Sequence, residues 1–326
     1  MKTKLFYAFD VNSWRGAKIE PLMKHSTFEW LTEYSPIVSD ARYRKVRGNQ
    51  LCDLLVYATG IPIFLISEKF RNILDENGFN GYKCFPIKSI EGVEATYYGW
   101  LNTNESGFVS KIYPANYMNT NPEYLVFNLK TWKNYDIFHL KDTLWNICTP
   151  EVKSILEKHK ITNLKFIPKY IGFEIDEEMF MQKRWDEEIP TKDKFIEYEL
   201  YKLTQKMDTD FTLEDLHFVI RSEIGLSTYI PIAIDKIISR EFANIERSEE
   251  MKWTRSEFLE SILLCSIMET SLDYWNKYFN EYNRLKTFLS NVTNKEIDDM
   301  SKGLLGFKNQ INNFINLDIN NLQVTN

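Results

Sequence analysis

The side chains able to do chemistry in this chain are few and widely spaced. Zinc sites and cysteine–histidine catalytic pairs need imidazole and thiol groups to converge, often from positions a few residues apart. No HExxH, CxxC or HxH spacing occurs, and no cysteine lies close to a histidine in the sequence. The residues concerned are His25, His139, His159, His217, Cys52, Cys84, Cys148 and Cys265. We therefore expect no metal, no cofactor and no enzymatic activity.

The alternative is a hydrolase-type enzyme whose site is assembled from residues distant in sequence, using one of the cysteines. Neither a G-x-S-x-G nucleophile motif nor a glycine-rich phosphate-binding motif supports it. His217 lies in an apolar helical segment, where a core histidine bonded to a carbonyl is the commoner arrangement. The cysteines lie in otherwise apolar segments, so we expect them to be buried free thiols.

An acidic run with two aromatic residues is the candidate for a partner-binding surface. Its carboxylates and rings are Asp176, Glu177, Glu178, Asp186, Glu187, Glu188, Phe180 and Trp185. An aromatic anchor within a polar rim is typical of interface hot spots, and carboxylates favour a basic partner. The alternative is a solvated segment between domains, with Trp185 filling the domain junction.

A basic cluster at residues 42–48, RYRKVRG, suggests contact with phosphate or nucleic acid. The net charge of −6 and the pI of about 5.5 argue against it, because non-specific nucleic-acid binding needs a basic footprint. We favour a solvated strand or loop balanced by Asp40 and Asp53, and we do not expect nucleic acid as a partner. A nucleic-acid-linked regulator stays the second alternative.

The elements that must position these residues are of two kinds. In the first half, short runs rich in Val, Ile, Tyr and Phe indicate strands. Helices that begin at Ser67 and Thr149 interrupt them, because these hydroxyls cap helix starts and Pro150 suits a first helical position. The expected strands are 5–9, 54–57, 63–66, 82–87, 94–101, 123–129 and 164–167.

The two helix-to-strand segments of this half resemble each other. Residues 68–86 align with 150–168 without a gap, and apolar positions fall in step. The identical positions are Ile73 and Ile155, Leu74 and Leu156, Lys83 and Lys165, and Pro86 and Pro168. The sequence leaves two interpretations open. The segments are copies of an internal repeat, or they share only the pattern that any capped helix followed by a strand has.

From residue 193 onward the pattern is helical. Thr212 is expected to cap a helix with a broad apolar stripe, and Gly225 to close it. Pro231 is expected in the first turn of the next helix, and Thr254 with Glu257 forms a capping box that opens a third. A long aromatic helix is expected over 271–289. The chain therefore predicts an α+β fold, with an N-terminal mixed sheet-plus-helix domain (1–190) followed by an all-helical C-terminal domain (191–326).

Part of the helical half resembles a known class of proteins. Its order is Ile224-Gly225-Leu226, then YIPIA from Tyr229, then a Leu-Leu helix that ends near Tyr274 and Trp275. This order resembles the immunity proteins of contact-dependent growth inhibition systems. Those proteins carry a Gly-Asp-rich link before the third helix, whereas this chain has RSEEMKW at 247–253, so a partner contact in that loop does not carry over.

The N-terminal half carries a second resemblance over about residues 40–180. Its motifs are CDLL from Cys52, FLISEKF from Phe64, GYKCFPI from Gly81 and YYGWL from Tyr97. They resemble a family of bacterial polymorphic-toxin immunity proteins that was formerly catalogued as a domain of unknown function. The motifs are apolar and fold-like, so the resemblance identifies no site.

Both resemblances imply an immunity protein that binds and neutralises a cognate, basic toxin domain without covalent chemistry. No secretion signal is visible, and no apolar run approaches the roughly 20 residues that cross a bilayer. We therefore expect a cytoplasmic protein with no membrane partner. The sequence leaves the oligomeric state open.

Overall fold

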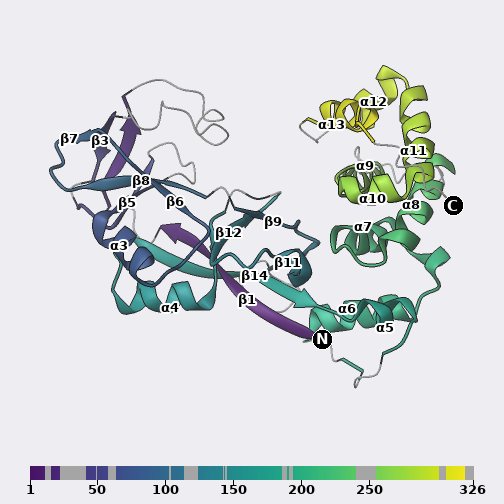
Figure 1. The fold of residues 1–326 in the computed structure, drawn as a ribbon, viewed down its shortest axis with the longest axis horizontal. Coiled ribbons are helices and arrows are strands. Elements are labelled where there is room, and N and C mark those ends of the chain that lie inside the picture. Colours follow the sequence, from purple (N-terminus) through teal and green to yellow (C-terminus); the bar gives the residue numbers. More distant parts are fainter. Residues whose placement is uncertain are drawn as a thin grey trace. The chain divides into compact units, whose positions relative to one another are not determined.

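The fold is mixed α+β, as expected (Figure 1). The computed structural model describes residues 1–11, 16–22, 42–48, 50–57, 64–102, 104–113, 124–141, 143, 145–185, 189–190, 194–239, 255–300 and 306–319. The chain separates into two compact units, Lys2–Glu174 and Ile175–Asn326, which we call the sheet unit and the helical unit. The division follows Glu174 rather than the expected residue 190, because residues 175–185 pack with the helices.

The sheet unit contains two seven-stranded sheets. Their orders are β10-β11-β14-β1-β13-β12-β9 and β6-β8-β5-β4-β2-β3-β7. The end strands of each order are close in sequence, β9 with β10 and β6 with β7, so each sheet curls back on itself. The strands are β1 (Lys2–Val11), β2 (Lys18–Pro21), β3 (Arg42–Arg47), β4 (Leu54–Tyr57), β5 (Phe64–Ser67), β6 (Lys83–Pro86), β7 (Ser89–Glu91), β8 (Tyr97–Leu101), β9 (Glu105–Ser106), β10 (Lys111–Tyr113), β11 (Tyr124–Asn128), β12 (Ile137–Leu140), β13 (Ile147–Cys148) and β14 (Leu164–Glu174).

The first strand of the chain lies in the middle of its sheet. β1 runs antiparallel to β14 along its whole length, from Lys2 opposite Glu174 to Val11 opposite Leu164. On its other side it pairs with β13. Phe6 and Ala8 are fully buried in this strand, because alternate side chains of a strand point to the same face.

Two helices, α3 (Glu68–Glu76) and α4 (Pro150–Lys158), pack against each other beside the sheets (Figure 1). Both begin at the expected caps, Ser67 and Thr149, whose side chains accept hydrogen bonds from the third residue on. Their apolar faces enter one core with both sheets. Its buried members are Phe9, Leu54, Ile66, Phe70, Ile73, Leu74, Trp100, Ile137, Cys148, Val152, Leu156 and Leu164.

All regular elements described in the helical unit are helices. They are α5 (Glu177–Met181), α6 (Phe195–Thr204), the 3-10 turn η3 (Asp208–Asp210), α7 (Leu213–Arg221), α8 (Leu226–Ser239), α9 (Arg255–Met268), α10 (Leu272–Lys277), α11 (Phe279–Asn291), α12 (Asn294–Met300) and α13 (Phe307–Ile315). The sheet unit adds one 3-10 turn, η2 (Leu129–Thr131). None of the described helices in either unit is long and apolar enough to span a membrane.

Two helix ends differ from expectation. Thr212 caps α7 in a capping box with Asp215, as predicted for the cap, but Glu223 closes the helix in a left-handed conformation (φ 54°) before Gly225 does. Pro231 lies inside α8 rather than in its first turn. Burial of the neighbouring Tyr229 and Ile230 outweighs the backbone hydrogen bond that proline cannot make. The predicted Thr254 cap lies outside the described residues.

The expected long aromatic helix is two helices, α10 and α11, which meet at Tyr278. The backbone of Tyr278 leaves the helical region there, with φ −113° and ψ 54°. Trp275 remains fully buried and meets the ring of Phe314 at 5.2 Å. Tyr282 is also buried and donates its hydroxyl to the carbonyl of Phe314 at 3.2 Å. The break therefore lets two aromatic side chains enter one core.

Candidate functional site

The acidic run expected to contact a partner begins at α5. Oδ1 of Asp176 caps this helix by accepting the backbone N–H groups of Glu178 and Met179, at 3.0 and 3.2 Å. A carboxylate suits this position because the helix N-terminus carries partial positive charge. Glu178 is exposed and accepts a hydrogen bond from Gln182 at 3.0 Å. Both carboxylates therefore lie at the surface, and Asp176 also fixes the start of the helix.

Glu177 and Phe180 are directed into the helical unit instead. Oε1 of Glu177 accepts the backbone N–H of Gly225 at 2.7 Å. The ring of Phe180 has no exposed surface and meets Tyr229 nearly edge-on, with centroids 6.5 Å apart. Phe180, expected as an aromatic anchor for a partner, thus packs inside the unit and offers no ring surface to another protein.

Trp185 is half-buried and meets the edge of Tyr201 on α6, with centroids 5.8 Å apart. This contact lies within the helical unit. The remaining members of the predicted surface, Asp186, Glu187 and Glu188, lie outside the described residues. The placement of the acidic rim therefore stays a prediction for that part of the run.

The exposed carboxylates of α5 continue onto the η3 turn. Met207, which precedes η3, is 67% exposed, more than any other large apolar side chain in the described part of the chain. Asp208 and Asp210 follow it, Asp210 exposed and the side chain of Asp208 about one-third exposed. We call the set Asp176, Glu178, Met207, Asp208 and Asp210 the α5–η3 surface. It combines an exposed thioether, a group frequent at promiscuous binding surfaces, with carboxylates that favour a basic partner.

Lys183 joins the two parts of this surface. Its Nζ lies 2.7 Å from Oδ1 of Asp208 and donates to the hydroxyl of Tyr229 at 3.1 Å. It also lies 4.5 Å above the ring of Phe211 and 5.6 Å from that of Phe180. Because an ammonium group is attracted to aromatic faces, the rings and the carboxylate of Asp208 jointly hold the side chain of Lys183 in place. Lys183 has φ 56°, a conformation that costs a non-glycine residue about 1 kcal/mol or more.

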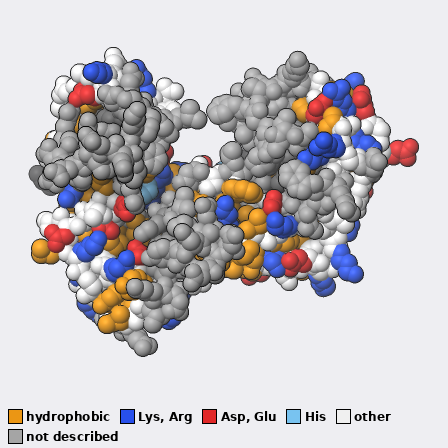
Figure 2. All heavy atoms as spheres, turned by 180° about the vertical axis from the view of Figure 1, so that it is seen from behind, with side chains coloured by type: hydrophobic (Ala, Val, Ile, Leu, Met, Phe, Trp, Pro, Cys, Tyr) orange, Lys and Arg blue, Asp and Glu red, His pale blue; other side chains and the backbone are white. Residues whose placement is uncertain are grey.

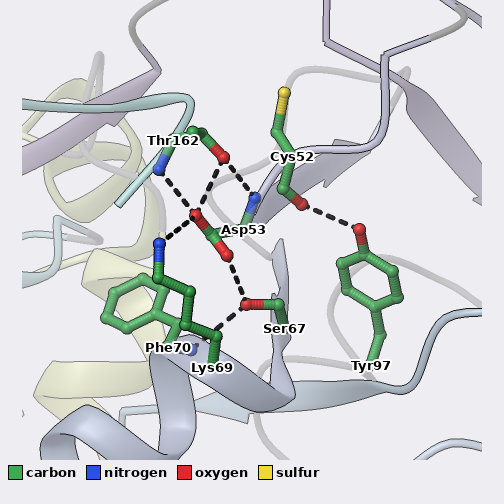
Figure 3. Close-up of polar contacts among 7 residues, drawn as sticks. All are labelled: Cys52, Asp53, Ser67, Lys69, Phe70, Tyr97 and Thr162. Atoms are coloured by element: carbon green, nitrogen blue, oxygen red, sulfur yellow. Dashed lines mark hydrogen bonds and ion pairs between the residues drawn. The ribbon is translucent and has the colours of Figure 1, made fainter. Parts of the chain in front are cut away.

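Asp53 is the most connected polar group described in the sheet unit (Figure 3). Its Oδ2 accepts the backbone N–H and the hydroxyl of Thr162 at 2.8 and 2.9 Å, and its Oδ1 accepts the hydroxyl of Ser67 at 2.8 Å. The backbone N–H of Asp53 donates to Thr162 in return, at 2.7 Å. Nζ of Lys69 lies 3.5 Å away. The carboxylate therefore ties the start of β4 to the cap of α3 and to the turn before β14.

The electrostatics of this cluster indicate a structural role for Asp53. Burial alone would raise its pKa, but the hydrogen bonds from Thr162 and Ser67 and the charge of Lys69 hold the pKa below its ordinary value. The neighbouring Cys52 thiol points to the carbonyl of Gln50, 3.7 Å away, and burial raises its pKa. A raised pKa leaves little of this thiol as the nucleophilic thiolate at neutral pH.

The other thiols have the same character. All four cysteines are free, and three are buried while Cys84 is half-buried. Burial raises the pKa of Cys84 and of Cys265 to about 12, and it also raises the pKa of Cys148 well above its ordinary value. Across the residues that the structure describes, no group of three or more His, Cys, Asp or Glu side chains is arranged to hold a metal ion.

His217 on α7 lies in the core of the helical unit. Its Nδ1 lies 2.9 Å from Oγ of Ser266, and that hydroxyl donates to the carbonyl of Ile262 at 2.8 Å. Because a hydroxyl has one proton, the imidazole donates to Ser266 and cannot act as its base. Burial, with the nearby charge of Arg221, lowers the pKa of His217 to about 3. The imidazole is therefore a neutral core donor, bonded to a hydroxyl rather than to the expected carbonyl.

The basic cluster is the strand β3. Tyr43 is fully buried, whereas Arg42, Arg44 and Arg47 are exposed. Arg44 forms an ion pair with Glu20 and lies opposite Glu91 on the next strand. Asp53, expected to balance the cluster, is held instead by Thr162, Ser67 and Lys69, and Asp40 lies outside the described residues. Acidic and basic side chains also lie interspersed over the described surface in Figure 2.

No protein-family model matches the chain, and no curated protein matches it.

Proposed function

We propose that this chain is a bacterial immunity protein that binds a cognate toxin domain in the cytoplasm and neutralises it without covalent chemistry. The observation that carries the proposal is the α5–η3 surface, where the exposed Met207 precedes Asp208 and Asp210, and where Lys183 links η3 to the end of α5. The two sequence resemblances to toxin-immunity proteins support the same function. Inhibition requires only that the bound chain covers the toxin's active site or locks its conformation.

The chemistry of the α5–η3 surface favours a basic partner. An apolar side chain that becomes buried on binding contributes affinity, and the surrounding carboxylates raise the association rate with a cationic surface. Lys183 holds η3 against α5, so the carboxylates are fixed before the partner arrives. Preorganisation of this kind lowers the entropic cost of binding.

The test uses the C-terminal domain of a large secreted protein encoded next to this chain. We expect the two proteins to co-purify, and the affinity to be measurable by calorimetry. The double variant Glu178→Lys with Asp210→Lys should weaken binding by about tenfold to a hundredfold, which corresponds to about 1.4 to 2.8 kcal/mol. Met207→Ala should weaken it further.

The matched control reverses two exposed carboxylates of the sheet unit, Glu76→Lys with Glu94→Lys, and so changes the net charge equally. If this control weakens binding as much as the double variant, the effect is one of net charge and the placement on the α5–η3 surface is wrong. Failure of the unaltered chain to bind the neighbouring C-terminal domain would reject the proposed function itself.

A further inference from the structure

The two sheets of the sheet unit contain the same five-strand arrangement. One sheet has the order β14-β1-β13-β12-β9, and the other has β6-β8-β5-β4-β2. In both, the first four strands are antiparallel to their neighbours and the last strand is parallel to the fourth. Equal order and equal direction across five strands exceed what two unrelated sheets share by default.

The register of the strands agrees residue by residue. At every strand contact that the two sheets share, residue pairs of one sheet have counterparts at matching positions of the other. The corresponding pairs are Phe85–Gly99 and Ile167–Ala8, Ile66–Tyr98 and Cys148–Tyr7, Leu54–Ile66 and Ile137–Cys148, and Val56–Lys18 and His139–Glu105. The parallel pairs Tyr43–Ile90 and Phe127–Gly172 extend the correspondence to β3 and β11.

The helices match in the same way. After α3, Gly78 has φ 67° and the N–H of Phe79 donates to the carbonyl of Leu74 at 3.2 Å. After α4, Lys160 has φ 52° and the N–H of Ile161 donates to that of Leu156, also at 3.2 Å. The likeness of 68–86 to 150–168 therefore extends from side-chain pattern to backbone geometry.

A second clasp mirrors that of Asp53. Oδ2 of Asp136 accepts the backbone N–H of Asn80 at 3.0 Å, and the N–H of Asp136 donates to Oδ1 of Asn80 at 3.1 Å. Asp136 corresponds to Asp53, and Asn80 to Thr162, in the alignment of the two halves. The clasps are therefore reciprocal: an aspartate of each half is held by the turn after the helix of the other half.

Chain order divides the unit into two modules, each with a first strand, a sheet and one helix. The first module runs from β1 to β7 and the second from β8 to β14. The first strands are exchanged, because β1 lies between β13 and β14 whereas β8 lies between β5 and β6. Both modules contribute matching residues to the central core. Phe9 of the first module corresponds to Trp100 of the second, and Leu74 corresponds to Leu156.

We propose that the sheet unit is one module present twice in tandem, and that the module's interaction surface recognises a second copy of itself. That surface consists of the edges of the two strands that pair with the exchanged strand, β5 and β6 in the first module and β13 and β14 in the second, together with the aspartate clasp. Exchange of an identical element is a low-cost route by which two copies associate. The inference does not depend on the proposed toxin-binding function.

The test exchanges the clasp residues between modules in the full chain. Thr162→Asn places at one clasp the residue found at the other, and Asn80→Thr does the reverse. Thr162→Ala and Asn80→Ala are the matched controls. We expect the alanine variants to lower the urea denaturation midpoint of the sheet unit. Each exchange variant should lower the midpoint by no more than half as much as its alanine control.

If both exchange variants lose as much as their alanine controls, the clasps are not equivalent and the proposal is wrong. A second measurement addresses the strand exchange. A specific protease site placed at Glu94 and Ala95, in the exposed segment between the modules, lets the folded chain be cut there. We expect the two pieces to remain a 1:1 complex after dilution into the nanomolar range. Separation of the two pieces under native conditions would overturn the proposal.

Discussion

In the sheet unit the carboxylate of Asp53 is held by backbone and hydroxyl donors, whereas in the helical unit the ammonium of Lys183 lies over aromatic rings beside one carboxylate. The donors around Asp53 come from fixed turns and a helix cap. The rings around Lys183 are side chains, which adjust more readily. The sheet unit therefore depends on backbone positions, and the helical unit on side-chain packing.

Glycines in the two units show the same difference. A Cβ added at Gly81 would lie 1.9 Å from the carbonyl oxygen of Ile137. One added at Gly225 would lie 2.3 Å from the sulfur of Met181. A carbonyl of a central strand cannot move without its sheet, but a methionine side chain can rotate away.

The largest effect is expected for Gly81→Ala. The φ of 96° and the contact with the Ile137 carbonyl should together cost about 3 kcal/mol or more, measured as the free energy of unfolding of the sheet unit. Gly78→Ala is the matched control, since Gly78 also has positive φ but nothing lies within 4 Å of its added Cβ. A cost of about 1 kcal/mol is expected there. Equal losses in both variants would show that strain alone, and not backbone contact, matters.

Asp53→Ala should be the next most damaging. It leaves the N–H of Thr162 and two hydroxyls without their acceptor, at a cost of about 2 to 3 kcal/mol. Asp10→Ala, which removes the exposed ion pair with Lys165, should cost under about 1 kcal/mol. Urea denaturation measures both. Because the folded pKa of Asp53 is lowered, its contribution is present above the unfolded pKa of about 4 and is lost as pH falls below it.

Lys183→Met should destabilise the helical unit by about 1 to 2 kcal/mol, because the thioether keeps the packing but loses the ring and carboxylate contacts of the cation. Lys183→Arg retains the charge and should lose less. Hydrogen exchange of peptides from α5 and α8 reports the effect locally. If methionine is tolerated as well as arginine, the rings hold the side chain by burial alone.

The smallest effect is a pH dependence from His217. Its folded pKa of about 3 lies below the unfolded value of about 6.5, so the unfolded chain binds a proton first as pH falls. Between pH 7 and pH 6 the helical unit should lose about 0.7 kcal/mol. His217→Gln should remove this part of the slope, whereas His159→Gln, at the exposed end of α4, should leave the helical unit unchanged. Hydrogen exchange of α7 and α9 measures it.

Features set by local interactions could be predicted from the sequence. The caps Ser67, Thr149 and Thr212 act over three residues, and the longer alternating runs became strands. The strands β9 and β13 have two residues each, too few to show a period. The burial of Phe180 depends on Tyr229, which lies far along the chain, so the acidic composition around it gave no sign that the ring points inward. The exchange of β1 and β8 likewise depends on strands that lie elsewhere in the sequence, so no local pattern indicates it.

The central place of β1 has a consequence for synthesis. This strand leaves the ribosome before both of its neighbours, β13 and β14, which are complete only when Glu174 has emerged. Until then β1, with its alternating apolar residues, has no neighbouring strand to pair with. Unpaired strands of this kind readily pair with other chains. Lys2 and Lys4 at its beginning carry charges that discourage such pairing, so two lysines that lie in the central strand of the finished sheet can also protect the nascent chain.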